Sequence, residues 1–169
     1  MLKYKILFIG LGTMGFHMAS YLSKIKKYEL YVYNRTKITE KKWLRKYSGK
    51  NYNFNKNIKF DFIISCLRDD KAINSVITHI DNSKCFKNST LFIDHSTISL
   101  DQVDKLFKFS KKNNFQFLDA PITGGEEGAK KGKLSVMVGG IPSKFKKAKT
   151  IISAYSNNIV LMGKVGSGQ

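Results

Sequence analysis

Three glycines close to the amino end are spaced so that they could hold a phosphate group. Gly10, Gly12 and Gly15 directly follow the apolar run 4–9, and from Met14 onward apolar residues recur every three or four positions, as in an amphipathic helix. Such a turn lets the backbone approach a pyrophosphate, and the free N–H groups of the helix start attract its charge. The alternative is a glycine turn that serves only packing. We predict a dinucleotide-binding turn made of Gly10, Leu11, Gly12, Thr13, Met14 and Gly15.

The residues after the second apolar run bear on which dinucleotide would bind. Sites that select NAD place an acidic residue about 20 positions beyond the glycine turn, where it holds the ribose 2′-hydroxyl. Here Asn34 occupies that position, and Arg35 and Thr36 follow it. A carboxylate would repel a 2′-phosphate, whereas a guanidinium binds one through charge-assisted hydrogen bonds. An ordinary polar turn is the alternative. We predict that Asn34, Arg35 and Thr36 hold a 2′-phosphate, so that NADP(H) is favoured over NAD(H).

Strands and helices must alternate along the chain to position these residues. Short apolar runs typical of buried strands alternate with segments of helical periodicity, which predicts an α/β, Rossmann-type, doubly wound sheet. The sheet is expected to be mostly parallel, with extra edge strands, antiparallel ones included, near the C-terminus. The predicted strands are 4–9, 29–33, 60–67, 91–93, 115–118, 134–138 and 159–162. The predicted helices are 14–25, 39–47, 71–80, 100–112 and 143–155, and segment 48–59 shows no clear pattern.

Net charge is the unusual feature of the composition. The chain of 169 residues has 30 lysines and arginines against 12 aspartates and glutamates, a formal net charge of +18. Such an excess suggests an anionic partner, nucleic acid or a phosphate-bearing ligand above all. The lysines are spread through every segment and no nucleic-acid recognition motif accompanies them. We therefore favour a lysine-rich solvated surface with no specific nucleic acid partner, and a basic nucleic-acid-binding protein is the less favoured alternative.

Cysteine spacing and hydropathy argue against several other classes. Cys66 and Cys85 form no CxxC pair and have no histidine at ligand spacing, so neither a zinc site nor a disulfide framework is expected, and no metal site is predicted. No apolar run approaches the roughly 20 residues that a spanning helix needs, and no signal peptide is visible. We expect no membrane partner and a cytoplasmic location.

Four motifs, in order along the chain, resemble those of the β-hydroxyacid dehydrogenases, typified by 3-hydroxyisobutyrate dehydrogenase and related to 6-phosphogluconate dehydrogenase. They are the segments 8–15, 65–67, 94–97 and 119–125. The resemblance implies that Cys66 and Leu67 cover the cofactor and that Ser96 and Thr97 meet its nicotinamide end. It also implies that a small carboxylic acid substrate is held by three residues, Thr123, Gly124 and Gly125. Thr123 replaces the serine usual in the family, and its extra methyl group would narrow the pocket.

The resemblance further implies an oxidoreductase that transfers hydride between nicotinamide and a small β-hydroxy acid or its aldehyde. In the family, a glycine turn matching 166–169 leads into a long helix with the catalytic lysine, and an all-helical domain follows. We therefore expect 1–163 to be an NAD(P)-binding domain and 164–169 to begin the interdomain helix, with the C-terminal helical domain absent. Any homo-oligomer is expected to form through that absent domain. No catalytic residue is assigned in this chain, which is expected to be inactive alone; a truncated dinucleotide-binding module without turnover is the alternative.

Overall fold

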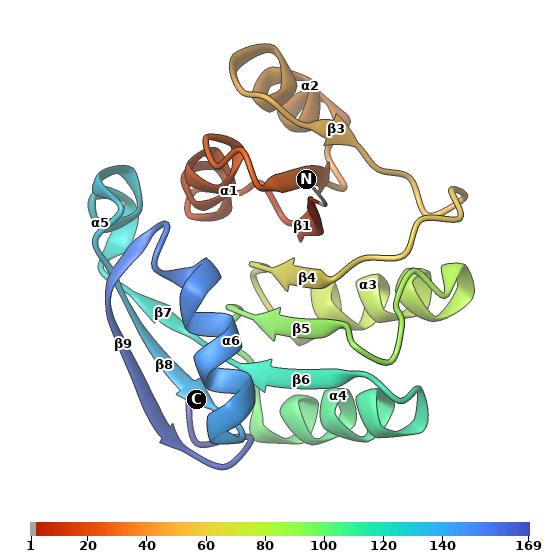
Figure 1. The fold of residues 1–169 in the computed structure, drawn as a ribbon, viewed down its shortest axis with the longest axis vertical. Coiled ribbons are helices and arrows are strands. Elements are labelled where there is room, and N and C mark those ends of the chain that lie inside the picture. The colour runs from red at the N-terminus through yellow and green to blue at the C-terminus, as the bar shows by residue number, and fades with distance from the viewer. Residues whose placement is uncertain (1–2) are drawn as a thin grey trace.

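The computed structural model describes residues 3–169, which form a twisted sheet covered by helices on both faces (Figure 1). Neighbouring strands follow the order β3-β2-β1-β4-β5-β6-β8-β7, and β9 pairs with β8. The strands are β1 Tyr4–Ile9, β2 Tyr28–Tyr33, β3 Lys50–Asn51, β4 Phe62–Ser65, β5 Leu91–Asp94, β6 Gln116–Asp119, β7 Ile122–Thr123, β8 Leu134–Gly139 and β9 Ser156–Gly163. The helices are α1 Gly15–Ser23, α2 Lys37–Lys46, α3 Asp70–Ser83, α4 Leu100–Lys112, α5 Gly125–Lys131 and α6 Pro142–Ile152.

The strands from β3 to β6 are all parallel, which confirms the expected doubly wound sheet. Their carboxyl ends lie at one edge because the register aligns the last residues of the strands. Ile9 pairs with both Tyr33 and Ser65. Ser65 in turn pairs with Asp94, and Asp94 with Asp119. The loops that follow these residues are therefore neighbours, and ligands of such sheets bind at this edge.

Each face of the sheet has its own apolar core. Met18 and Leu22 of α1 pack on one face together with Ile151 of α6, and α3 and α4 pack on the other face, with Ile73 and Leu106 buried there. The parallel strands between them are nearly continuous apolar runs because they are buried on both sides. The strands are therefore held between two packed layers of helices.

The C-terminal part of the sheet departs in part from the expectation. β8 runs antiparallel to β6 and β7, as expected of an edge addition, but β9 runs parallel to β8. The sequence patterns missed the short strands β3 and β7, and they missed helix α5, whose two glycines hide any apolar periodicity.

Some predicted boundaries also move. β4 is shorter than 60–67 because the chain leaves the sheet after Ser65, α2 begins at Lys37, and β9 is longer than 159–162. Residues 164–169 form turns with no helical residue as far as Gln169, and the predicted domain boundary stays a prediction. None of the helices within residues 3–169 is long and apolar enough to cross a membrane.

Candidate functional site

The glycine turn between β1 and α1 contains two glycines that the fold requires and one that it does not. Gly10 has φ +98°, and a Cβ there would lie 2.3 Å from the Cys66 carbonyl oxygen. A Cβ on Gly15 would lie 2.0 Å from the Gly10 carbonyl oxygen. A Cβ on Gly12 would meet nothing within 4 Å. Packing alone therefore explains Gly10 and Gly15, whereas the bare backbone at Gly12 is free for a ligand to approach.

The predicted 2′-phosphate turn lies beside this glycine turn and is fastened to it by Asn34. The Asn34 Oδ1 accepts a hydrogen bond from the Leu11 N–H at 2.9 Å, and its Nδ2 donates to the Thr36 carbonyl at 3.0 Å. The Asn34 N–H donates to the buried carboxylate of Glu40 at 2.9 Å. The same carboxylate also pairs with the Lys37 ammonium at 3.1 Å. The Asn34 side chain thus shapes the turn, and Arg35 and Thr36 beside it are exposed.

A cavity of about 470 Å³ extends from these two turns to the start of α3. Two arginines line it, Arg35 after the end of β2 and Arg68 after the end of β4, and none of its lining residues is acidic. His79 of α3 lines its far side and stacks on Phe54, with ring centroids 5.1 Å apart. The cavity therefore combines positive charge with an aromatic edge, which suits a ligand carrying several phosphates and a planar base. Its sixteen lining residues are Ile9, Gly10, Leu11, Gly12, Tyr33, Asn34, Arg35, Thr36, Thr39, Cys66, Leu67, Arg68, Ala72, Ser75, Val76 and His79.

A buried hydrogen-bond network joins the loops that follow β4 and β5. The Oδ1 of the fully buried Asp94 accepts from the hydroxyls of Ser65 and Ser96, both at 2.6 Å, and from the Ser96 N–H at 3.1 Å. The Leu67 N–H then donates to the Ser96 hydroxyl oxygen at 3.0 Å. Burial raises the pKa of Asp94 to about 6, although the three donated hydrogen bonds favour its charged form. This network fixes the two loops relative to each other.

His95 is a packed residue rather than a free acid or base. Its Nδ1 lies 2.6 Å from the Ala120 carbonyl, which can only accept, so Nδ1 carries the proton. Burial lowers the pKa of His95 to about 4, so the ring is neutral and its Nε2 accepts from the Tyr155 hydroxyl at 2.8 Å. Both ring nitrogens are therefore occupied within the protein.

A second, smaller cavity of about 310 Å³ adjoins the first and shares Cys66, Leu67 and Arg68 with it. It brings Thr97 and Met14, predicted at the cofactor, together with the predicted substrate residues. Of the other predicted residues, Ser96 is buried and lines neither cavity, and Thr13 and Gly15 line neither cavity as well. The residues that line the smaller cavity are Met14, Cys66, Leu67, Arg68, His95, Thr97, Ile122, Thr123, Gly124 and Gly125.

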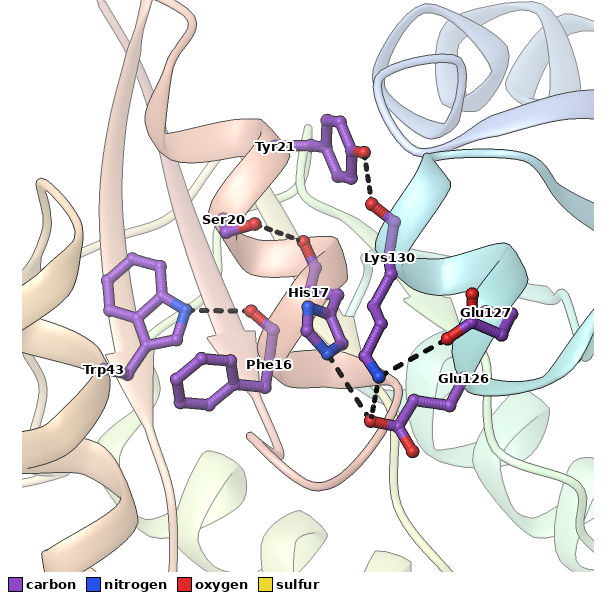
Figure 2. A network of polar contacts seen from close by, with 8 residues as sticks. All are labelled: Phe16, His17, Ser20, Tyr21, Trp43, Glu126, Glu127 and Lys130. Carbon is purple, nitrogen blue, oxygen red and sulfur yellow. Dashed lines mark hydrogen bonds and ion pairs between the residues drawn. The ribbon is translucent and has the colours of Figure 1, made fainter.

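A contact between α1 and α5 connects the glycine turn with the predicted substrate loop (Figure 2). The Tyr21 hydroxyl donates to the Lys130 carbonyl at 2.7 Å. The Lys130 ammonium pairs with Glu126 at 2.9 Å and with Glu127 at 3.5 Å, and His17 Nε2 lies 4.0 Å from Glu126. Burial, and after it Lys130, lowers the pKa of His17. The two acidic residues that follow Gly125 are thus neutralised by Lys130 instead of facing a ligand alone.

Several residues of the site escaped the sequence analysis. Arg68 and His79 enter the larger cavity, and nothing in their local sequence distinguishes them from surface residues. Asp94 is part of a recognised motif, but its role in joining two loops depends on Ser65, 29 residues away. Only the parallel register, which places these strand ends side by side, could have suggested that contact.

Comparison with known proteins gives a consistent set of similarities. Residues 5–163 match the family model described as the NAD binding domain of 6-phosphogluconate dehydrogenase. An uncharacterized oxidoreductase of Shewanella frigidimarina is 36% identical over 168 residues, which are 98% of this chain and 57% of that protein. The mitochondrial 3-hydroxyisobutyrate dehydrogenase of Drosophila melanogaster is 33% identical over 165 residues, 96% of this chain and 50% of that enzyme. The chain thus spans about half the length of the curated relatives it matches.

Solved structures share the fold at lower identity. The 3-hydroxyisobutyrate dehydrogenase of Mycobacterium tuberculosis with L-serine superposes with a TM-score of 0.90 at 24% identity, covering 99% of this chain and 57% of that one. An imine reductase from Myxococcus stipitatus in complex with NADP+ has a TM-score of 0.83 at 16% identity, covering 97% and 57%. At these identities the likeness establishes the Rossmann-type architecture.

Proposed function

The chain belongs to the family of the NAD binding domain of 6-phosphogluconate dehydrogenase, and from that membership we propose that it binds NADP(H) in preference to NAD(H). The observation that carries the preference is the 470 Å³ cavity, which has arginines on two walls and no acidic lining residue. The family's oxidoreductases hold a nicotinamide dinucleotide, and the bare backbone at Gly12 leaves room for its pyrophosphate. We also propose that 1–163 forms the cofactor domain and that 164–169 leads out of it.

In this proposal the glycine turn holds the pyrophosphate and the turn after β2 holds the 2′-phosphate. Gly12, Thr13 and Met14 would present backbone N–H groups to the pyrophosphate, whereas the N–H groups of Gly10 and Leu11 already donate to the Tyr33 carbonyl and the Asn34 side chain and would shape the turn. Arg35 would donate to the 2′-phosphate together with the Thr36 hydroxyl, and Asn34 would keep their turn against Leu11. Since Arg68 lines both cavities, it would add positive charge where they join.

The smaller cavity would hold the nicotinamide end and a small carboxylic acid. Cys66, Leu67 and Thr97 would border the nicotinamide, and buried Ser96 would support them through its hydrogen bond to Leu67. The Thr123 hydroxyl and the Gly124 and Gly125 backbone would bind the substrate carboxylate. When bound, NADP(H) supplies hydride exchange with a β-hydroxy acid or its aldehyde.

The ionisable residues that line this cavity are poorly suited to transfer a proton near neutral pH. Burial, and after it the Asp94 carboxylate, raises the pKa of Cys66 to about 12, and both ring nitrogens of His95 are occupied. We therefore propose that residues 1–169 bind the cofactor without turning over short aldehyde acids such as glyoxylate.

Titration of the purified chain with NADPH and with NADH, followed by nicotinamide fluorescence, tests the cofactor choice. Arg35→Ala should weaken NADPH binding about tenfold or more, because a hydrogen bond between charged groups contributes ~1.5–3 kcal/mol, and it should spare NADH. Arg45→Ala is the matched control, because Arg45 is exposed on α2 and lines neither cavity. Equal affinity of the unmutated chain for both cofactors would contradict the preference, and binding of neither would contradict the site itself.

A further inference from the structure

The turn 166–168 is fastened to the end of β6 by a single buried carboxylate. The Gly166 N–H donates to one oxygen of Asp119 at 2.7 Å, and the Gly168 N–H donates to the other at 2.9 Å. Asp119 is fully buried. Hydrogen bonds from two backbone N–H groups stabilise a charge that would otherwise be costly to bury. Asp119 therefore determines where this turn lies.

The space around this carboxylate is made by glycines. A Cβ on Gly139 would lie 2.3 Å from Asp119 Oδ1. A Cβ on Gly168 would lie 2.8 Å from Asp119 Oδ2 and 2.6 Å from the Met137 carbonyl oxygen. Neither position can accept a side chain without displacing the carboxylate or the backbone beside it. The close fit indicates that the turn can pack against β6 and β8 in only one position.

Gln169, next to this turn, reaches the loop that borders the smaller cavity. Its Oε1 accepts from the Ile98 N–H at 3.2 Å and its Nε2 donates to the Ser96 carbonyl at 3.1 Å. The two contacts enclose Thr97, which lines the cavity. The Ser96 hydroxyl in turn accepts from the Leu67 N–H, and Leu67 lines both cavities. Hydrogen bonds and the short stretches of chain between them thus connect Asp119, through the turn, to both loops of the site.

We infer that Asp119 and Gln169 are positioning residues for the nicotinamide end of the cofactor site. Neither lines a cavity. Asp119 fixes the position of the turn, and the turn places the Gln169 side-chain amide against the loop 96–98. That amide holds the loop in the position that the ligand requires. This inference rests on the proposed cofactor site and gives a role to two residues to which the sequence analysis assigned none. Loss of the Gln169 contacts would loosen the smaller cavity and leave the larger one intact.

Two probes separate this effect from a general loss of structure. NADPH would occupy both cavities, whereas adenosine 2′,5′-bisphosphate carries the adenosine and the 2′-phosphate without nicotinamide and needs only the larger one. For Gln169→Ala we expect an NADPH affinity about tenfold lower, since two hydrogen bonds that order the loop are lost, and an unchanged affinity for adenosine 2′,5′-bisphosphate. Gln169→Glu keeps the acceptor for the Ile98 N–H, and its NADPH affinity should lie between those of the unmutated chain and Gln169→Ala. Ser167→Ala is the matched control, because within residues 3–169 its hydroxyl has no hydrogen-bond partner.

A measurement without any cofactor tests the hydrogen bonds directly. In hydrogen exchange the Ile98 amide should be protected in the unmutated chain and should lose protection in Gln169→Ala, with the strand amides of β5 unaffected. Equal losses of affinity for both probes, or no loss for either, would overturn the inference, as would unchanged exchange at Ile98. If the unmutated chain bound neither probe, the proposed cofactor site would be contradicted and this inference with it; exchange would then still report on the contact.

Discussion

The two adjoining cavities differ in how their walls are built. The walls of the larger cavity that would face phosphates are the bare backbone at Gly12 and arginine side chains, of which Arg68 is 93% exposed. The walls of the smaller cavity are loops held by hydrogen bonds, which are buried between Asp94 and Ser96 and part-buried where Ser96 meets Leu67 and Gln169. Exposed charges can adapt to a ligand, whereas a buried network holds one arrangement. We infer that the larger cavity supplies most of the affinity for a ligand and that the smaller cavity orients the end of the ligand that it holds.

The largest effect is expected from a methyl group added at the glycine turn. Gly15→Ala should cost about 4 kcal/mol or more of unfolding free energy, because its Cβ would lie 2.0 Å from the Gly10 carbonyl oxygen. Gly12→Ala, the matched variant, should leave stability nearly unchanged and abolish NADPH binding, because its methyl group occupies only ligand space. Urea unfolding and cofactor titration of both variants check this. NADPH binding retained by a stable Gly12→Ala chain would mean that the turn does not approach a pyrophosphate.

The next largest effect, about 3 kcal/mol of unfolding free energy, depends on pH and is expected from the two buried ionisable residues Asp94 and His95. Since the pKa of Asp94 is raised to about 6, its contribution to stability is present at low pH and is lost as the pH rises from about 4 to 6. Since the pKa of His95 is lowered to about 4, its contribution is present above about pH 6.5 and is lost as the pH falls toward 4. The two effects oppose each other in the unmutated chain.

Replacing either residue should make the pH dependence caused by the other one visible. Relative to the unmutated chain, Asp94→Asn should lose about 3 kcal/mol of unfolding free energy between pH 6.5 and pH 4, since only the His95 effect remains. His95→Gln should show the opposite slope between pH 4 and 6. Urea unfolding at several pH values measures both slopes, and parallel pH profiles for the three chains would contradict the two pKa shifts.

The smallest effect is expected at the contact that joins the two regions, between α1 and α5. Lys130→Ala removes ion pairs whose partners Glu126 and Glu127 are exposed by 49% and 71%, so the unfolding free energy should fall by less than about 1 kcal/mol. The pKa of His17 should rise, because Lys130 now lowers it. NMR titration of the His17 ring measures this. A lowered or unchanged pKa would mean that Lys130 does not act on His17 in solution.

The sequence predicted the parallel part of the fold well because its signals are local. A buried strand, a glycine turn and an amphipathic helix each show within a dozen residues, as at 4–25. Helix α5 was missed because its fold depends on distant contacts: Ala129 is fully buried, and the Lys130 carbonyl binds Tyr21, 109 residues away. No local pattern encodes such a contact.

In the candidate site, too, local features could be predicted from the sequence and contacts between distant residues could not. Its motifs were visible in the sequence, and the structure brings most of them to the two cavities. The supporting contacts were not visible, because the carboxylate of Asp119 meets amides 47 and 49 residues later and Gln169 meets Ile98 across 71 residues. Asn34 illustrates a finer limit: its type suggested a ligand contact, but only its neighbours reveal that it binds Leu11.

The bond between Asp119 and the turn 166–168 also has a consequence for how the protein folds during synthesis. The strands up to β6 are complete at Asp119, but the amides that satisfy its carboxylate come 47 and 49 residues later. At roughly 5–20 residues per second, the ribosome needs roughly 2–10 seconds to supply them. Over that interval the residues of the parallel sheet have all been synthesised, whereas the residues that complete its edge at β6 have not. Closure of this edge is therefore expected to follow formation of the parallel sheet.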